Sequence, residues 1–390
     1  MISQEIRDHL ERKILPFWTA LKDEEYGGFY GYMDNNLLLN RKADKGCVLN
    51  SRILWTFATA AEVLGREDLR AYADHAYEFA RKFEDAEHGG VYWSVTYDGY
   101  PADTTKHTYC QAFAIYGLAA YYRLTGKREA LDKAMDLFRI IETRCKDEGG
   151  YLEAMKADFS PETNEKLSEN GVMAGRTMNT LLHVVEAYTE LHRACPDVQV
   201  MIATVEGLNE FVDKIYNPGK RRLDVFFDED FRPLLDMQSY GHDIEGSWLI
   251  WDSAETFLQP DGRETWKAMC LDLLESVTER AFTDRGLKYE SVNGEVNETR
   301  TWWPQAEAML GFEFGWRMTG DKKWLARMRK EWDYIRKEMV DPREGAEWYN
   351  ELREDGTLIY GKPMVDEWKC PYHNGRMCLR LIRAGLPDGT

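Results

Sequence analysis

The sequence predicts an all-α protein: an (α/α)6 barrel of twelve helices with β-hairpins at its mouth. The first observation is a repeat, because a tight turn with an aromatic-rich hairpin pattern returns at intervals of roughly 60 to 75 residues. The second is that helical patterns fill these intervals in pairs, separated by the glycines and prolines that usually end helices. The six hairpin motifs are centred near Gly27, Gly89, Gly149, Leu223, Gly286 and Gly345.

Five helix pairs are predicted between the hairpins. The first helix of each pair is apolar on most faces and the second carries more charge, which is typical of a buried inner ring and an exposed outer ring. One helix remains at each end of the chain, over 2–21 and 373–384, and their pairing would close the ring. We therefore expect a single domain over residues 1–390. The internal pairs span 52–64 with 69–83, 109–124 with 128–144, 178–193 with 198–215, 242–258 with 264–282, and 303–318 with 322–340.

The charge balance excludes several classes of partner. With 50 basic and 68 acidic residues the net charge is −18, which argues against binding nucleic acid or an anionic membrane. The N-terminal segment is amphipathic and charged rather than a signal peptide, and no apolar stretch approaches the roughly 18 residues of a membrane span. The seven scattered cysteines contain no CxxC pair, as expected for reduced thiols. We expect a cytoplasmic protein that is a monomer or a weak homodimer.

Polar and aromatic side chains gather where the inner helices are expected to begin. Because each of these helix starts follows a hairpin, their N-terminal ends should meet at one mouth of the barrel. Six helix N-termini would add positive potential there for an oxygen-rich ligand or a developing enediolate. The residues at these positions are Arg52, His107, Tyr109, Asn179, His183, His242, Glu245, Trp248, Trp302, Trp303, Glu307, Trp368, His373 and Arg376.

The stretch SYGHDIEGSWLIW, residues 239–251, concentrates this chemistry. His242, Glu245 and Trp248 are three residues apart and share one face of the predicted helix. An imidazole that titrates near neutrality, a carboxylate that can orient it and a flat ring suit proton chemistry on a sugar. A buried histidine satisfied by a glutamate beside a core tryptophan is the structural alternative. His107 and Trp303 also have structural explanations, as a loop residue and a core ring.

Other site chemistries find less support in the motifs. There is no HExxH, no closely spaced histidine pair and no nucleotide-binding glycine motif, so we expect neither a metal nor another cofactor, although histidines from different helices could ligate zinc. Glu245 and Glu307 could serve as the acid and base of an inverting glycoside hydrolase, which requires a separation of roughly 6.5–9.5 Å. Histidines suit another reaction better, in which a proton next to a carbonyl is removed and returned. A non-catalytic glycan-binding barrel would leave the mouth histidines unexplained.

Six segments carry a resemblance to a known family. They resemble the N-acylglucosamine 2-epimerase superfamily, and most of all its bacterial cellobiose 2-epimerase branch. The resemblance extends over essentially the whole chain, and it implies an (α/α)6 barrel and a cofactor-independent epimerisation at C2 of a reducing-end glucose. Cellobiose would become glucosyl-mannose and lactose epilactose. The segments are ADKGCVLNSRILW, DTTKHTYCQAFAIY, TMNTLLHVVEAYTEL, SYGHDIEGSW, WWPQAEA and WKCPYHNGRM.

The resemblance also implies roles for the catalytic groups. His242 and His373 would remove and return the C2 proton through a cis-enediolate, and His183 would assist ring opening and closing. Arg52 would stabilise the oxygens at C1 and C2. An aldose–ketose isomerase acting on mannose-type sugars would share the enediolate but return the proton to C1, and it stays open as an alternative.

Further residues would orient these groups or hold the substrate. By the resemblance, Glu245 and Glu307 orient the histidines, and Trp368 lies nearest the second ring of a disaccharide. Trp248 is predicted to contact the sugar from its place on the face of His242. The remaining substrate-binding residues would be Tyr109, Asn179 and Trp303.

Overall fold

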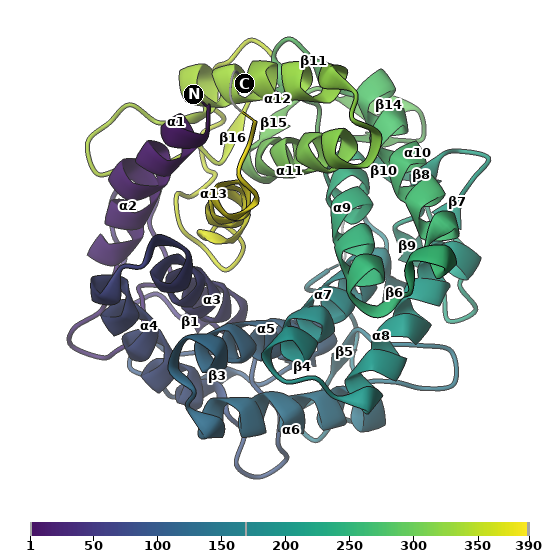
Figure 1. The fold of residues 1–390 in the computed structure, drawn as a ribbon. Helices are drawn as coiled ribbons and strands as arrows, with labels where there is room; N and C mark the ends of the chain where they lie inside the picture. Colours follow the sequence, from purple (N-terminus) through teal and green to yellow (C-terminus); the bar gives the residue numbers. More distant parts are fainter. Residues whose placement is uncertain (1, 168–169, 388–390) are drawn as a thin grey trace.

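Two concentric rings of helices make up the protein (Figure 1). The computed structural model describes residues 2–167 and 170–387. Each inner helix packs on the next along the chain, and α13 returns to α3, which closes the inner ring. The predicted (α/α)6 barrel is therefore confirmed. The inner helices are α3 (Cys47–Leu64), α5 (Thr108–Thr125), α7 (Met178–Ala194), α9 (Tyr240–Phe257), α11 (Trp302–Thr319) and α13 (Tyr372–Ala384).

Each inner helix packs against an outer partner. The two ends of the chain supply one of these pairs, because α1 packs on α13, as predicted. Nowhere in the described ranges does a helix combine the length and apolarity needed to cross a membrane. The outer ring consists of α1 (Ile2–His9), η1 (Leu10–Ile14) and α2 (Leu15–Ala20); α4 (Glu67–Ala80) with η2 (Arg81–Phe83); α6 (Arg128–Arg144); α8 (Val198–Glu210) with η3 (Phe211–Ile215); α10 (Glu264–Arg280), preceded by η4 (Pro260–Gly262); and α12 (Lys322–Tyr334) with η5 (Ile335–Met339).

The difference between the rings follows from their patterns of apolar residues. On outer helix α6 the buried residues Ala130, Ala134, Leu137 and Ile141 form one stripe at intervals of three and four. Inner helix α5 is instead buried at nearly every position from Thr108 to Tyr121. Such a helix is stable only with neighbours on all sides, so it occupies the inner ring.

Six tight hairpins follow the six outer helices, as the repeat predicted. Four of them are closed by the bridges Lys22–Phe29, Glu84–Val91, Lys146–Tyr151 and Val340–Trp348. The other two pair β7 (Tyr216–Asn217) with β8 (Arg222–Leu223) and β11 (Phe282–Thr283) with β12 (Gly286–Leu287).

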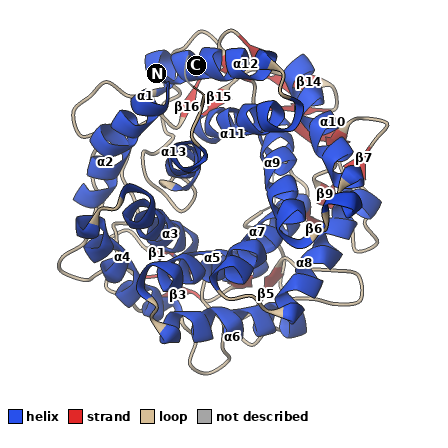
Figure 2. Ribbon diagram, in the orientation of Figure 1, coloured by secondary structure: helices blue, strands red, loops and turns tan. Residues whose placement is uncertain are grey.

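A second set of strand pairs joins neighbouring repeats, and the sequence did not predict it. The strand before an inner helix pairs with the segment after the following hairpin, and the bridge Met33–Val365 closes this belt between the chain ends. Figure 2 shows how short these strands are beside the helices. The pairings are β1 (Lys45–Gly46) with β2 (Ser94–Val95) and β3 (Pro101–Asp103); β4 (Lys106–His107) with β5 (Ala154–Met155); β6 (Arg176–Thr177) with β9 (Phe226–Phe227); β10 (Met237–Ser239) with β13 (Glu290–Val292) and β14 (Glu295–Asn297); and β15 (Arg300–Thr301) with β16 (Glu351–Leu352).

Side-chain clamps fix the inner helices to the hairpins. In four repeats a polar side chain near the start of the inner helix accepts a hydrogen bond from a hairpin N–H, and these buried bonds satisfy backbone groups that would otherwise be costly to bury. Each of these hydrogen bonds fixes where the N-terminus of an inner helix lies along the barrel axis, relative to the mouth. The accepting and donating residues are Asn50 and Phe29 (3.2 Å), Gln111 and Val91 (2.7 Å), Asp243 and Leu223 (2.8 Å), and Gln305 and Leu287 (2.7 Å).

Two inner helices begin at least two residues before their predicted starts. The first inner helix begins at Cys47, so Arg52 lies in its second turn rather than at its start. Tyr240 and Gly241, which precede the predicted helix start at residue 242, belong to α9. In both places the inner helix starts directly after a two- or three-residue strand of the belt, and so short a strand has no period of its own to mark the boundary.

Candidate active site

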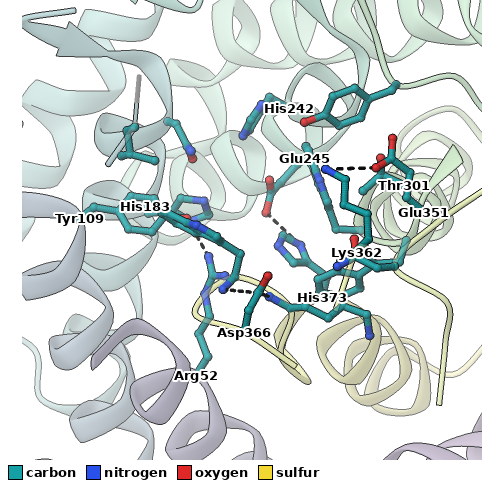
Figure 3. A pocket seen from close by; sticks show the side chains of 18 of the residues that line it. Arg52, Tyr109, His183, His242, Glu245, Thr301, Glu351, Lys362, Asp366 and His373 are labelled. Atoms are coloured by element: carbon teal, nitrogen blue, oxygen red, sulfur yellow. Dashed lines mark hydrogen bonds and ion pairs between the residues drawn. The ribbon is translucent and has the colours of Figure 1, made fainter. Parts of the chain in front are cut away.

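A cavity of about 390 Å³ opens at the hairpin end of the barrel. All six inner helices contribute to its lining, as the clustering at the helix starts predicted. Figure 3 shows the labelled side chains converging on it from several directions. Ten of the residues predicted to gather at the mouth line the cavity: Arg52, Tyr109, Asn179, His183, His242, Glu245, Trp302, Trp303, Trp368 and His373.

Two predicted site residues lie beneath the lining. Glu307 is fully buried directly behind His373. Trp248 donates its indole N–H to Glu307 Oε2 at 3.0 Å and borders a separate cavity, so its position does not support the predicted contact with a sugar. The reason is the helix rise, since six residues along α9 carry Trp248 about 9 Å away from His242.

His373 is held by a carboxylate. Its Nδ1 lies 2.6 Å from Oε1 of Glu307. Burial lowers the pKa of His373 well below its ordinary value, and the charges of Arg52 and Arg376 lower it further. The ring is therefore neutral, with its Nδ1–H donated to Glu307, and its Nε2 carries the lone pair of a base.

His242 is held by a hydroxyl. Its Nδ1 lies 2.7 Å from Oγ of Ser239, and burial together with the charge of His183 lowers the pKa of His242 to about 3. The sequence predicted Glu245 as its partner, and this was wrong. Glu245 instead accepts a 2.5 Å bond from Arg376 and lies 3.8 Å from Nδ1 of His373. Three residues along α9 carry the carboxylate about 4.5 Å deeper into the barrel, where α13 supplies the opposite charge.

Trp303 lies against both imidazoles. Its ring centroid is 4.7 Å from that of His242 and 5.4 Å from that of His373. Gly241 makes this position possible, since a Cβ there would lie 2.4 Å from the Trp303 ring. Two neutral histidines from α9 and α13 thus share one aromatic neighbour in one cavity.

One arginine joins the carboxylates behind the histidines. Arg376, fully buried, donates to Glu186 at 2.5 Å, to Glu245 at 2.5 Å and to Glu307 at 2.7 Å. Burial acts to raise the pKa of Glu186, but Arg376 and the 2.8 Å bond to His183 lower it to about 2. Burial and the charge of Glu307 raise the pKa of Glu245 to about 7. Burial also raises the pKa of Glu307, against the opposing charge of Arg376.

The same cluster offers ligand atoms for a cation. One ligand atom each of Glu245, Glu307 and His373 lies within 4.8 Å of the others, and the structure describes no other such group of three. Arg376 already donates to both carboxylates, so the positive charge that a metal would supply is present there as a guanidinium. The expectation that no metal is needed stays a prediction.

Arg52 carries a positive charge without a carboxylate partner among the described residues. It donates to the hydroxyl of Tyr109 at 2.7 Å and to Sγ of Cys370 at 3.8 Å. Its guanidinium lies over the rings of Phe113, at 4.1 Å, and Tyr372, at 4.4 Å. Aromatic faces stabilise a cation without neutralising it, so the charge remains available to an oxyanion in the cavity.

Comparison with known proteins agrees with this geometry. The family model described as N-acylglucosamine 2-epimerase matches residues 27–374. The chain belongs to this family. A cellobiose 2-epimerase from Eubacterium cellulosolvens is 46% identical over the full length of both chains. The expectation of an isomerase, a carbohydrate 2-epimerase, is confirmed.

Solved structures of other proteins superpose closely on this chain. A sugar epimerase from a ruminal bacterium matches with a TM-score of 0.98 at 44% identity, covering 99% of this chain and 100% of the other. A cellobiose 2-epimerase from Bacillus thermoamylovorans gives 0.95 at 41% identity, covering 98% and 99%. A D-mannose isomerase gives 0.84 at 17% identity, covering 98% of both chains, and this likeness concerns the fold alone.

Of the histidines predicted at the mouth, His107 is the one that does not line the cavity of this epimerase. It is fully buried behind the wall, at the residue that caps the start of α5. The loops and short strands of the mouth supply lining residues in its place, and sequence reasoning missed them because such segments have no periodicity to show which side chains face inward. Glu351 and Lys362 form a 3.3 Å ion pair among these (Figure 3). The other residues of these segments are Lys166, Leu167, Tyr289, Asn297, Thr301, Asn350, Asp366 and Lys369.

Proposed function

We propose that this protein epimerises the reducing-end glucose of β-1,4-disaccharides at C2. Cellobiose becomes glucosyl-mannose and lactose becomes epilactose, without a cofactor. The observation that carries the proposal is the pair of neutral imidazoles, His242 and His373, beside one ring in one cavity. Relatives named cellobiose 2-epimerase at 46% and 44% identity over nearly the full chain support the substrate class.

The reaction begins with opening of the sugar ring. His183 lines the cavity and is bonded through Nδ1 to Glu186, which leaves Nε2 to exchange a proton with the ring oxygen or the anomeric hydroxyl. Opening produces the aldehyde that makes the C2 proton acidic. Arg52 then faces the C1 and C2 oxygens, where negative charge develops as the proton leaves.

The C2 proton is removed by one imidazole and returned by the other. In one direction Nε2 of His373 takes the proton, and Glu307 stabilises the imidazolium that forms. As negative charge develops on the planar cis-enediolate, His242 takes up a proton from solvent and delivers it to the other face of C2, which inverts C2, and His373 then returns its proton to solvent. The reverse reaction exchanges the two roles, because both epimers pass through the same enediolate.

Unpaired acceptors in the cavity suit a polyhydroxylated ligand. Oδ1 of Asn179 and Oε2 of Glu245 are buried and have no hydrogen-bond partner among the described residues. Buried acceptors without donors are costly, and sugar hydroxyls supply donors. We assign Asn179 to such a bond, and Tyr109, Trp303 and Trp368 to contacts with the sugar rings.

The geometry does not favour an inverting hydrolase. Oε1 of Glu245 and Oε1 of Glu307 both accept bonds from the same nitrogen of Arg376, at 2.5 and 2.7 Å. Two oxygens that accept hydrogen bonds from the same nitrogen lie closer together than the roughly 6.5–9.5 Å that an inverting acid and base require. Glu307 also lies beneath the lining.

The test is incubation of the purified protein with cellobiose in D2O, followed by NMR. The expected result is deuterium at C2 together with a mannose-type reducing end. A ketose product would show an aldose–ketose isomerase, and free glucose would show a hydrolase. An unchanged and unlabelled spectrum would contradict the proposal.

The cellular and assembly states expected from the sequence remain predictions. We propose that the chain acts in the cytoplasm as a monomer or a weak homodimer and that residues 1–390 form one catalytic unit. Light scattering on a size-exclusion column across a range of concentrations measures the assembly state.

A further inference from the structure

We infer that His107 is a positioning residue that, through Asn164, fixes the part of the cavity wall formed by Lys166 and Leu167. This inference deepens the proposed function and rests on it. No role in proton transfer is involved, because His107 lies outside the cavity lining. We use the name latch for three hydrogen bonds of the Asn164 side chain, which join it to His107, to the N–H of Leu167 and to the carbonyl of Ala174.

The hydrogen bonds of His107 determine its tautomer. A backbone N–H can only donate, and that of Tyr109 points at Nδ1 of His107 at 3.3 Å. Nδ1 is therefore the acceptor nitrogen, and the single proton of the neutral ring lies on Nε2. Burial keeps the ring neutral, since it lowers the pKa of His107 to about 4. One nitrogen thus caps α5, and the other has a proton to donate.

Asn164 receives that proton and passes the constraint into the loop. Its Oδ1 lies 3.1 Å from Nε2 of His107 and also accepts from the N–H of Leu167 at 3.2 Å. Its Nδ2 donates to the carbonyl of Ala174 at 3.3 Å. The side-chain amide of Asn164 forms hydrogen bonds through both its oxygen and its nitrogen, which fixes its orientation. The latch therefore holds the backbone at 164, 167 and 174 together.

The wall fixed in this way lies on the side of the cavity with Trp368. Lys166 pairs with Asp103 at 2.6 Å and lies over the ring of Trp93 at 5.3 Å. The ring of Trp93 in turn lies 5.7 Å from that of Trp368. Lys166 and Leu167 both line the cavity, and Leu167 is buried against the core. The latch should therefore control substrate binding rather than the proton transfers at His242 and His373.

Two substitutions break the latch from opposite sides. Asparagine is a favoured helix cap, so His107→Asn keeps an acceptor for the N–H of Tyr109 but is too short to reach Asn164. Asn164→Ala leaves the cap of α5 intact. For His107→Asn we expect KM for cellobiose to rise about five- to tenfold with kcat within about twofold, as loss of one buried hydrogen bond would give. Asn164→Ala also loses the bonds to Leu167 and Ala174, so its KM should rise at least as much, again with kcat within about twofold. The double variant should be no worse than Asn164→Ala.

Controls separate positioning from stability. His107→Ala removes the cap as well as the latch, so its Tm should fall more than that of His107→Asn while KM rises equally. His192→Asn is the matched substitution at another histidine whose Nδ1 accepts a backbone N–H, that of Asp197, outside the cavity lining, and it should leave KM unchanged.

Several outcomes would overturn the inference. An unchanged KM in both latch variants would do so, as would additive effects in the double variant or a fall in kcat at constant KM. Absence of epimerase activity in the unaltered protein would instead contradict the proposed function, so the two failures are distinguishable.

Discussion

The two imidazoles beside Trp303 are supported in different ways. On α13, His373 donates to a fully buried carboxylate that itself accepts from Arg376 and Trp248. On α9, His242 has the hydroxyl of Ser239 at the same ring nitrogen. Burial keeps both rings neutral, so the difference concerns what happens when a ring becomes charged.

A carboxylate stabilises an imidazolium far more than a hydroxyl does. His373 therefore gains a strong interaction as it accepts a proton, and His242 gains little. The two rings therefore differ in the group that supports their charged form, although the reaction asks each ring to act as base in one direction. The asymmetry teaches that the charged network on the α13 side carries more of the catalytic effect than the α9 side.

Removal of either imidazole should have the largest effect. We expect His373→Asn and His242→Asn each to lower kcat for epimerisation by about a thousandfold, within the range of acid–base catalysis by a positioned side chain. The remaining ring can still exchange the C2 proton of one epimer with solvent.

The isotope readout makes this prediction specific. In D2O each variant should label one epimer at C2 without inverting it, and the two variants should label opposite epimers. Labelling of both epimers by a single variant would contradict the assignment of one histidine to each face.

Replacement of the carboxylate behind His373 should have the next largest effect. We expect Glu307→Gln to lower kcat about a hundredfold, because an amide cannot stabilise the imidazolium as a carboxylate does. The acid limb of the pH profile of kcat should also move to lower pH, because loss of the negative charge of Glu307 lowers the pKa of His373 further. Glu313→Gln is the control on the same helix, outside the cavity lining, and should keep full activity.

The neutral state of His242 makes stability depend on pH. Its folded pKa of about 3 lies below the roughly 6.5 of a histidine in an unfolded chain, so the unfolded chain binds more protons between these values. Its contribution is fully present above pH 6.5 and is lost as the pH falls toward 3. Between pH 7 and 5 the wild type should lose up to about 2 kcal/mol more free energy of unfolding than His242→Asn. Urea titrations at both pH values measure this, and equal losses would show that His242 takes up its proton equally in the folded and unfolded states.

The barrel could be predicted from the sequence because the repeat and the period of the helices are local. Gly65, Gly126 and Gly320 end three inner helices with positive φ, and each glycine stands where the apolar pattern stops. The belt of strands could not be predicted, since pairs such as Met33 with Val365 join positions far apart and involve only a few residues.

Residues facing the cavity could be predicted, but their partners could not. Periodicity places His242 and Glu245 on one face of a helix, and a shared face suggested that they interact. The structure shows that depth along the barrel decides instead, because Glu245 lies at the level of Arg376 while His242 lies at the level of the strand that ends at Ser239. Contact between helices at a given depth is a tertiary property that no local pattern contains.

Loss of the hydroxyl behind His242 should have the smallest effect and tests the comparison most sharply. We expect Ser239→Ala to lower kcat about three- to fivefold, because a neutral hydrogen bond contributes about 1 kcal/mol. The ring of His242 would be less well fixed, but no charge is lost. Ser239→Thr keeps the hydroxyl and should retain most of the activity. A hundredfold loss in Ser239→Ala, equal to that in Glu307→Gln, would show that the two imidazoles are supported equally, and the asymmetry between α9 and α13 would then have no catalytic meaning.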